Sequence, residues 1–364
     1  MRLRACHLED FRNIASARLV FPTGGVFLRG ANGQGKSNLL EAIGLLHAFR
    51  SFRSPHLRPL IRRGSRRSRI FYRAEVDGVT HEVLFEFQPG EGRRILLDGE
   101  PVERLSDWLA RFPSVVLAQA DLSLVRGSPA ERRRLLDLHF STTHPDYYRH
   151  LRAYHRALRA RNRLLKDRSA PGLLRAYHHP LAEAAARLRE VRERETARLA
   201  PVLASVFAGI AGREEGPELA FTPGSTARTE EEFVAMWDEQ RERDLALRST
   251  QHGPHRDDWT LRLQAGAART YGSDGQQRNL VLALKLGLHR DLAERTGRTP
   301  LLLADDVLGE LDPDRRRAFW QWLPESCQVF ATGTEDLAHP GAREWTVYHV
   351  KGGTFAPNEA GEGV

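Results

Sequence analysis

Apolar and polar positions alternate along the first third of the chain, as they do in β-strands with one buried face. Before residue 30 the pattern predicts strands over Leu3–Leu8 and Ala17–Phe21, and the apolar run Val26–Leu28 is a third predicted strand. Beyond residue 60 alternation predicts strands over Ile70–Val76, His81–Gln88 and Arg94–Leu97, and Ser114–Ala118 is predicted as a short apolar strand. Asp77-Gly78 and Asp98-Gly99 are typical of tight turns between antiparallel strands. This part of the chain is therefore predicted to be rich in antiparallel strands.

From Pro129 the apolar spacing changes to that of amphipathic helices, without strand signals. The predicted helices, rich in Ala, Arg, Leu and Glu, are Ala130–His139, Tyr147–Leu165 and Leu181–Phe207. Afterwards strands and helices alternate again: strand Trp259–Leu263, a helix from Gln276, strand Pro300–Ala304, a helix from Pro313 and strand Gln328–Ala331. The tail after Gly352 is expected to be frayed. We therefore predict an α/β head formed by residues 1–140 and 246–364, with an inserted helical domain at 141–245.

A glycine loop lies between a predicted strand and a predicted helix. Residues Gly30–Ser37 follow the apolar run Val26–Leu28 and precede the amphipathic stretch Asn38–Phe49. This order is that of a phosphate-binding P-loop, in which backbone N–H groups surround a polyphosphate. Lys36 would reach the β- and γ-phosphates and Ser37 would ligate Mg²⁺. A chance match is the alternative, but the chain has only four lysines. The nucleotide-binding candidates are Gly30, Ala31, Asn32, Gly33, Gln34, Gly35, Lys36, Ser37 and Asn38.

Two further segments complete a candidate site. Leu301–Ala304 reads as a strand buried on both faces and ends in Asp305 and Asp306. Ligand groups lie at the carboxyl ends of such strands, so Asp305 is placed to hold Mg²⁺ and Asp306 to orient water as a base. The alternative is an ordinary acidic turn after a strand.

Residues 273–277 precede a long helix with leucines on one face. Ser273 and Gln276 have the spacing of a capping box, which explains them without any ligand. The same geometry is also an anion site, with a hydroxyl and a bare glycine at a helix N-terminus. One P-loop does not need a second such site for its own nucleotide, so the site would serve a nucleotide held by another subunit. These candidates are Ser273, Asp274, Gly275, Gln276 and Gln277.

The formal charge of +8 and the pI of about 9.9 favour a polyanionic partner. Nearly all the basic residues are arginine, a bias that genome composition can also produce. Nine arginines and no acid occupy residues 50–73, and a second dense stretch covers 149–168. DNA contact at the first cluster and a merely solvated face both remain open. The DNA-binding candidates are Arg62, Arg63, Arg66 and Arg67.

Cys6 and Cys327 are the only cysteines and form no Cys-x-x-Cys pair, which fits a reducing compartment. No apolar run approaches the length of a membrane span, and the N-terminus lacks the apolar segment of a secretory signal. These features predict a soluble, intracellular protein without a membrane partner.

The order of these motifs resembles that of the ABC-type ATPase head, and more closely that of the RecF family of bacterial recombination mediators. Three stretches carry the closer resemblance: Leu8–Asn13, Gly253–Asp257 and Asp305–Asp312. Residues 129–134 add to it. The resemblance covers most of residues 1–140 and 245–335, whereas the helical insertion is similar in length and character more than in motif.

The resemblance implies a slow, Mg²⁺-dependent ATPase whose two subunits sandwich ATP between them. Asp306 would be the catalytic carboxylate, Ser273, Gly275 and Gln276 would act in trans, and Asp312 would be the acid of the D-loop. It also implies binding to duplex DNA and to single-strand/double-strand junctions. The cellular role implied is recombinational repair of gaps and stalled forks, including replication and the SOS response. The partners implied are RecR, RecO as a further candidate, and the recombinase being loaded, in the cytoplasm at the nucleoid.

Some positions depart from the family pattern or stay open. Gln119 lies where a Q-loop would sense Mg²⁺ and water, but its surroundings are not distinctive. The switch histidine of ABC transporters is missing, and residues 332–334 read Thr-Gly-Thr. A hydroxyl there would contact the γ-phosphate, or hydrolysis would be slow. Asp306 is shorter than the glutamate usual in transporters, which also favours slow turnover. His255 is either a structural histidine or a site residue.

Three other classes share parts of this pattern. A soluble ABC subunit of another assembly, such as a transporter, would have the same motifs, normally with a switch histidine and no basic helical insertion. The head of an SMC-like tether would need arms of several hundred residues. The arms here have at most about 35–50 residues, or roughly 50–75 Å as helices. A kinase or GTPase would use the P-loop without residues 273–277.

Overall fold

The computed structural model describes residues 1–22, 24–54, 56–167, 171–212, 215–335 and 344–357. The chain divides into two compact units. One joins both ends of the sequence, residues 1–121 and 285–364, and the other comprises residues 122–284. The helical insertion predicted at 141–245 falls within the second unit, and its separate domain status stays a prediction.

One sheet of the first unit is antiparallel, in the order β2-β1-β4-β5-β6-β7. Its strands are β1 (Arg2–Phe11), β2 (Ile14–Val20), β4 (Ser68–Val76), β5 (Val79–Gln88), β6 (Gly92–Leu97) and β7 (Glu100–Pro101). Burial alternates along β4, as the sequence pattern predicts. Asp77 and Gly78 both have positive φ, the geometry of a type I′ hairpin turn. The predicted antiparallel strands are therefore confirmed.

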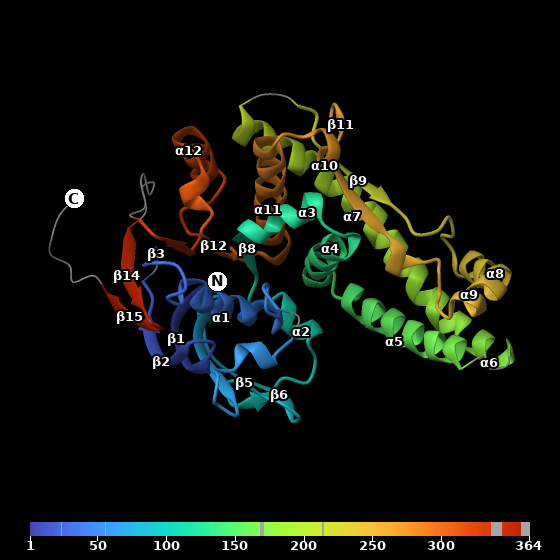
Figure 1. Ribbon diagram of the computed structural model, residues 1–364, viewed down its shortest axis with the longest axis horizontal. Coiled ribbons are helices and arrows are strands. Elements are labelled where there is room, and N and C mark those ends of the chain that lie inside the picture. Colours follow the sequence, from blue (N-terminus) through green and yellow to red (C-terminus); the bar gives the residue numbers. More distant parts are fainter. Residues whose placement is uncertain (23, 55, 168–170, 213–214, 336–343, 358–364) are drawn as a thin grey trace. The chain divides into compact units, whose positions relative to one another are not determined.

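The other sheet of this unit is parallel except at one edge, in the order β15-β14-β3-β13-β12-β8 (Figure 1). Its strands are β3 (Gly25–Arg29), β8 (Ser114–Ala118), β12 (Leu301–Asp305), β13 (Val329–Gly333), β14 (Trp345–Lys351) and β15 (Thr354–Pro357). Strands β14 and β15 were not predicted from the sequence. The expectation that the tail frays after Gly352 is wrong for residues 354–357, because β15 pairs with β14.

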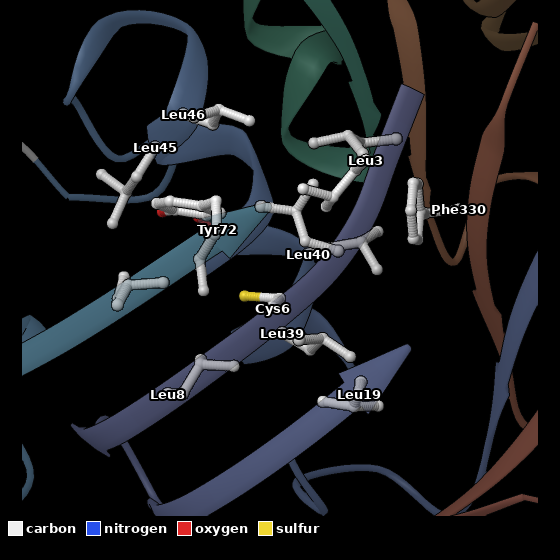
Figure 2. Close-up of a cluster of buried hydrophobic side chains, with 14 of the residues drawn as sticks. Leu3, Cys6, Leu8, Leu19, Leu39, Leu40, Leu45, Leu46, Tyr72 and Phe330 are labelled. Carbon is white, nitrogen blue, oxygen red and sulfur yellow. The ribbon is translucent and has the colours of Figure 1, made fainter. Parts of the chain in front are cut away.

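Helix α1 (Lys36–Ala48) contributes many of the buried side chains in the hydrophobic core of this unit. Leu39, Leu40, Leu45 and Leu46 are buried and lie near Leu3, Cys6, Leu8 and Tyr72 of the antiparallel sheet, together with Phe330 of β13 (Figure 2). The Tyr72 hydroxyl donates to the carbonyl of Ala42 at 2.6 Å. Each fully buried leucine contributes about 1.5–3 kcal/mol. The helix that begins at the P-loop is therefore also the one that both sheets bury.

The remaining elements of this unit are short. They are η1 (Arg58–Leu60), α2 (Ser106–Leu109), η2 (Gln119–Leu122, ending in the second unit), η4 (Leu308–Glu310) and α12 (Pro313–Gln321). Trp108 of α2 is buried and donates to the carbonyl of Leu46 at 2.8 Å, which fixes α2 against α1.

Helices dominate the second unit (Figure 1). Its elements are α3 (Ser123–Arg126), α4 (Pro129–Thr143), α5 (Tyr147–Lys166), α6 (Pro171–Ala176), α7 (His178–Ala211), β9 (Glu218–Thr222), α8 (Glu230–Glu239), α9 (Arg241–Leu247), η3 (Pro254–Arg256), β10 (Asp258–Leu263), β11 (Gly266–Ala267), α10 (Ala268–Tyr271) and the start of α11 (Asp274–Thr296). The expectation of an insertion without strands is wrong at β9, which pairs with β10. Trp259 of β10 packs on Phe221 of β9 in this small sheet.

No helix in the described segments is long and apolar enough to cross a bilayer.

Candidate nucleotide-binding site

The P-loop leaves the carboxyl end of β3 and enters α1. Gly33 has φ +77° and Gly35 has φ +119°, where a side chain would be strained. Lys36 is only 4% exposed, and its Nζ donates to the carbonyls of Gly30 at 2.7 Å and Ala31 at 3.1 Å. Ala31, Asn32 and Gly33 are exposed at the crest of the loop. The Lys36 ammonium is therefore held by the carbonyls of its own loop, whose residues 31–33 are exposed to solvent.

Contacts from outside the loop fix its shape. Asn13 donates to the carbonyl of Gln34 at 3.1 Å, and Gly353 N–H donates to the same oxygen at 2.8 Å. Gly352 N–H donates to Gln34 Oε1 at 2.8 Å, and Asn38 donates to Asn13 Oδ1 at 2.8 Å. The turn between β14 and β15 thus holds the P-loop, a contact that sequence reasoning missed because it comes from the other end of the chain.

The carboxyl ends of β12 and β13 bring two acids and a hydroxyl together. Thr332 Oγ1 lies 3.1 Å from Asp305 Oδ1 and 3.2 Å from Asp306 Oδ1. It also accepts a hydrogen bond from the Asp306 N–H at 2.8 Å. Asp306 has φ +53°, a left-handed conformation that such a contact helps to hold.

Asp305 also meets the start of α1. Burial raises the pKa of the Asp305 carboxyl, whereas hydrogen bonds from Ser37 and Thr332 act in the opposite direction. A serine hydroxyl and a carboxylate in contact are the oxygen ligands that Mg²⁺ takes from proteins at phosphate sites, the remaining ligands being water and phosphate. The two predicted Mg²⁺ ligands, Ser37 of the P-loop and Asp305 of β12, therefore meet at one edge of the sheet.

A buried ion network holds α1 at Glu41, about one turn beyond Ser37. Glu41 is fully buried and accepts two hydrogen bonds from Arg12, at 2.9 Å and 2.7 Å. Ser51 donates to the same carboxylate, and Arg53 lies 3.5 Å from it. Arg53 also donates to Asn38 Oδ1 at 2.7 Å. This network was not predicted from the sequence. The signal that could have indicated it is a single glutamate, Glu41, within an otherwise largely apolar helix.

The side chain of Gln119 bonds to a distant segment of the chain, whereas that of Asp312 bonds within its own helix. Gln119 is exposed, and its amide donates to Glu310 Oε1 at 2.7 Å, which joins the end of β8 to the turn after β12. Asp312 caps α12 by accepting from the Arg315 N–H at 2.9 Å. The roles of Gln119 as Mg²⁺ sensor and of Asp312 as D-loop acid stay predictions.

The predicted capping box is present at the start of α11. Ser273 N–H donates to Gln276 Oε1 at 2.7 Å, and Gln276 N–H lies 3.3 Å from Ser273 Oγ. Ser273 and Asp274 are exposed and Gly275 is half-buried. Arg126 of α3 donates to Asp274 Oδ1 at 2.5 Å and to Gln277 Oε1 at 2.6 Å. Nothing in the sequence indicated Arg126, because 148 residues separate it from Asp274.

Two other sets of predicted residues have clear positions. His255 has the environment of a structural histidine, with Nδ1 2.7 Å from the Tyr154 hydroxyl and Nε2 2.9 Å from the carbonyl of Thr250. Burial lowers the pKa of His255 to about 4. Arg62, Arg63, Arg66 and Arg67 are all exposed in the segment before β4. Arg62 is fixed by its N–H, which donates to the carbonyl of Asp10 at 2.8 Å.

A P-loop after β3, paired carboxylates after β12 and a capped glycine helix start at α11 are together the parts of an ABC-type ATPase head. The RecF/RecN/SMC N terminal domain model matches residues 2–354. The chain belongs to the RecF family of this group, as the relatives that it resembles over their full length establish.

Among these relatives is the DNA replication and repair protein RecF of Synechococcus sp. (strain JA-2-3B'a(2-13)), 36% identical over 100% of both chains. The protein of that name from Anaeromyxobacter sp. (strain Fw109-5) is 38% identical over 98% of this chain and 99% of its own. A solved structure of the recombination mediator RecF with ATP, in the RecFOR pathway, has a TM-score of 0.90 at 28% identity, covering 98% and 97% of the two chains. An SMC head bound to the C-winged helix domain of ScpA, with a TM-score of 0.58 at 15% identity, shares the fold.

Proposed function

We propose that this protein is an ATP-dependent DNA-binding protein of recombinational repair, in which ATP drives two copies together and slow hydrolysis releases them. The observation that carries the proposal is the contact of Ser37 and Thr332 with Asp305 at one sheet edge, next to the P-loop that holds Lys36. The proposal also draws on the RecF relatives, which are named for DNA replication and repair.

The chemistry assigned to the site is hydrolysis of the β–γ bond of ATP. Lys36 and the P-loop N–H groups bind the phosphates, and Ser37 and Asp305 hold Mg²⁺, which neutralises charge on the phosphates when bound. Asp306 accepts a proton from the attacking water as catalytic carboxylate. Gln119, which directly follows β8, is assigned the role of Mg²⁺ and water sensor. Asp312 is assigned the role of the D-loop acid. Two features favour slow turnover: Asp306 is shorter than a glutamate, and Thr332 stands where ABC transporters have the switch histidine.

The second half of the site comes from another copy. Ser273, Gly275 and Gln276 form a helix start with an exposed hydroxyl, which is suited to an anion. If this helix start contacts the γ-phosphate of the nucleotide bound by the other copy, it stabilises the dimer only while that phosphate is present. Hydrolysis then acts as a timer for residence on duplex or junction DNA. RecR and RecO are the proposed protein partners in placing the recombinase.

The two ABC alternatives fit less well. An SMC-like tether needs long arms, whereas α5 and α7 have 20 and 34 residues, or about 30 and 50 Å. A soluble subunit of another ABC assembly stays a candidate on motifs alone. The RecF relatives that cover the whole chain favour the repair role.

The experiment is molar mass by light scattering with and without ATP. Wild type is expected to become a dimer with ATP, and Lys36→Ala to stay a monomer because it does not bind the nucleotide. Ser273→Arg is expected to bind ATP normally and yet stay a monomer, because the tip then no longer accommodates the neighbour's phosphate. An ATP-loaded wild type that stays monomeric at high concentration and on DNA would contradict the proposal.

A further inference from the structure

The exposed face of α5 carries a straight row of cations. Their spacing alternates between three and four residues, which places them on one side of a helix. The opposite side buries Tyr147, Tyr154, Leu158 and Leu165, and α5 packs against α7 (Figure 1). At 1.5 Å per residue the row is about 26 Å long. We call these residues the α5 row: Arg149, Arg152, Arg156, Arg159, Arg163 and Lys166.

Most of this charge is not neutralised within the protein. Helix α5 contains no acidic residue. Arg149 pairs with Asp146 at 3.2 Å, and Arg152 lies over the Tyr148 ring at 5.8 Å. Across the described ranges, the other four members of the row have no carboxylate within ion-pair distance. Like charges one turn apart destabilise a helix, so the row has an energetic cost that an external anion would remove.

Helix α7 provides a comparison within the same unit. Several of its arginines that reach the surface are interleaved with glutamates and paired with them. Arg187 lies 3.2 Å from Glu190, Arg194 lies 3.7 Å from the same residue, and Arg198 lies 2.8 Å from Glu195. A compositional bias towards arginine acts on both helices alike. It therefore does not explain why one helix neutralises its arginines and the other does not.

We propose that the α5 row binds the sugar-phosphate backbone of duplex DNA. A duplex carries about one charge per 1.7 Å of axis, so it offers phosphates along the whole row. Protein partners are usually held by apolar anchors, and no large apolar side chain of α5 is exposed. The inference rests on the proposed function and adds a DNA contact in the second unit. This contact is distinct from the Arg62–Arg67 segment of the first unit.

The test compares two double variants that each remove two positive charges. Arg156→Gln with Arg163→Gln removes unpaired members of the row. Arg187→Gln with Arg194→Gln removes paired arginines of α7 and serves as the matched control. Affinity for a fluorescent gapped duplex is measured with ATP over a series of salt concentrations. Each lost phosphate contact reduces the slope of log affinity against log salt by about 0.9, so the α5 pair is expected to reduce it by about 2.

The expected result is a loss of affinity of at least about tenfold near 0.15 M salt for the α5 pair, with the control within about twofold of wild type. Equal losses in both variants, or an unchanged slope in the α5 pair, would overturn the inference and leave the proposed function standing. A wild type without salt-dependent duplex binding would overturn both. The urea midpoints and ATP binding of both variants report folding. If the α5 pair folds poorly, Arg152→Gln with Arg159→Gln tests the same row.

Discussion

Thr332 lies in β13, at the position that corresponds to the switch histidine of ABC transporters. Its hydroxyl oxygen lies within 3.2 Å of the carboxylates of Asp305 and Asp306. It also accepts a hydrogen bond from the Asp306 N–H. The residue is 2% exposed, so water does not replace these contacts. The proposed catalytic carboxylate is therefore oriented by a side chain on the neighbouring strand β13.

Thr332→Val is expected to reduce ATP hydrolysis by about tenfold or more, because a small displacement of a catalytic group has a large effect on rate. ATP binding should change little, since the phosphate contacts of the P-loop are untouched. Single-turnover hydrolysis and nucleotide titration separate the two effects. Thr332→Ser keeps the hydroxyl and should retain most of the activity. Equal loss in the serine and valine variants would mean that the hydroxyl is not the cause.

A negative charge at the proposed trans anion site needs an explanation. Asp274 is exposed at the start of α11, where it would repel a neighbour's γ-phosphate. Arg126 forms an ion pair with Asp274 and also holds Gln277. Arg126 therefore neutralises the acid and fixes the start of the helix.

Arg126→Gln is expected to weaken ATP-dependent dimerisation about tenfold, equivalent to about 1.4 kcal/mol of electrostatic repulsion. Adding Asp274→Asn removes the repelling charge and should restore much of the dimerisation. Sedimentation with ATP across a range of protein concentrations measures both effects. A purely structural role for Arg126 predicts additive losses instead, so a double variant weaker than either single variant would exclude the electrostatic account.

At the scale of elements, α1 is fixed on two sides. Apolar residues bury it between the sheets, while Glu41 binds Arg12 from the turn between β1 and β2. Because this carboxylate is fully buried, losing it leaves charged partners without compensation. The same salt bridge connects the segment that bears Asn13 to the P-loop helix.

Glu41→Gln is expected to lower the free energy of unfolding by about 3 kcal/mol, as for other broken buried ion pairs. The control is Glu75→Gln, which breaks the more exposed pair between Glu75 and Arg4. Surface pairs contribute about 0–1 kcal/mol, so the control should change little. Urea unfolding of both variants gives the comparison. Similar losses for the two substitutions would show that burial of Glu41 does not set its contribution.

The sequence predicts elements well where periodicity and turn chemistry are strong. A strand is present at every segment where the sequence predicts one, and the P-loop and capping box lie where the motifs place them. Strand β9 was missed because five residues in a helical stretch provide little alternation. Strand β14 was missed because its partner β3 lies more than 300 residues earlier in the chain. The contacts of Arg126 with Asp274 and of the Gly352-Gly353 turn with the P-loop were missed for the same reason, because contacts between distant residues leave no local signal in the sequence.

At the scale of the whole molecule, Asp306→Asn tests whether hydrolysis is a timer. The variant should bind ATP and DNA but hydrolyse ATP slowly, so it should dissociate from DNA at least about tenfold more slowly than wild type. Dissociation is followed by anisotropy after adding unlabelled duplex. Lys36→Ala combined with Asp306→Asn is the control and should not be retained. Rapid release by Asp306→Asn despite blocked hydrolysis would remove the timer from the mechanism.

Strand β3 has a consequence for how the protein is made. Both of its neighbours, β13 and β14, come from residues 329–351, which follow the second unit in the sequence. While a ribosome is still reading the earlier codons, the nascent P-loop strand has no sheet to join. Residues 122–284 contain all three strands of their own sheet and emerge before then. Translation therefore delivers the helical unit first, and the nucleotide site is assembled only after residues 329–351 have been made.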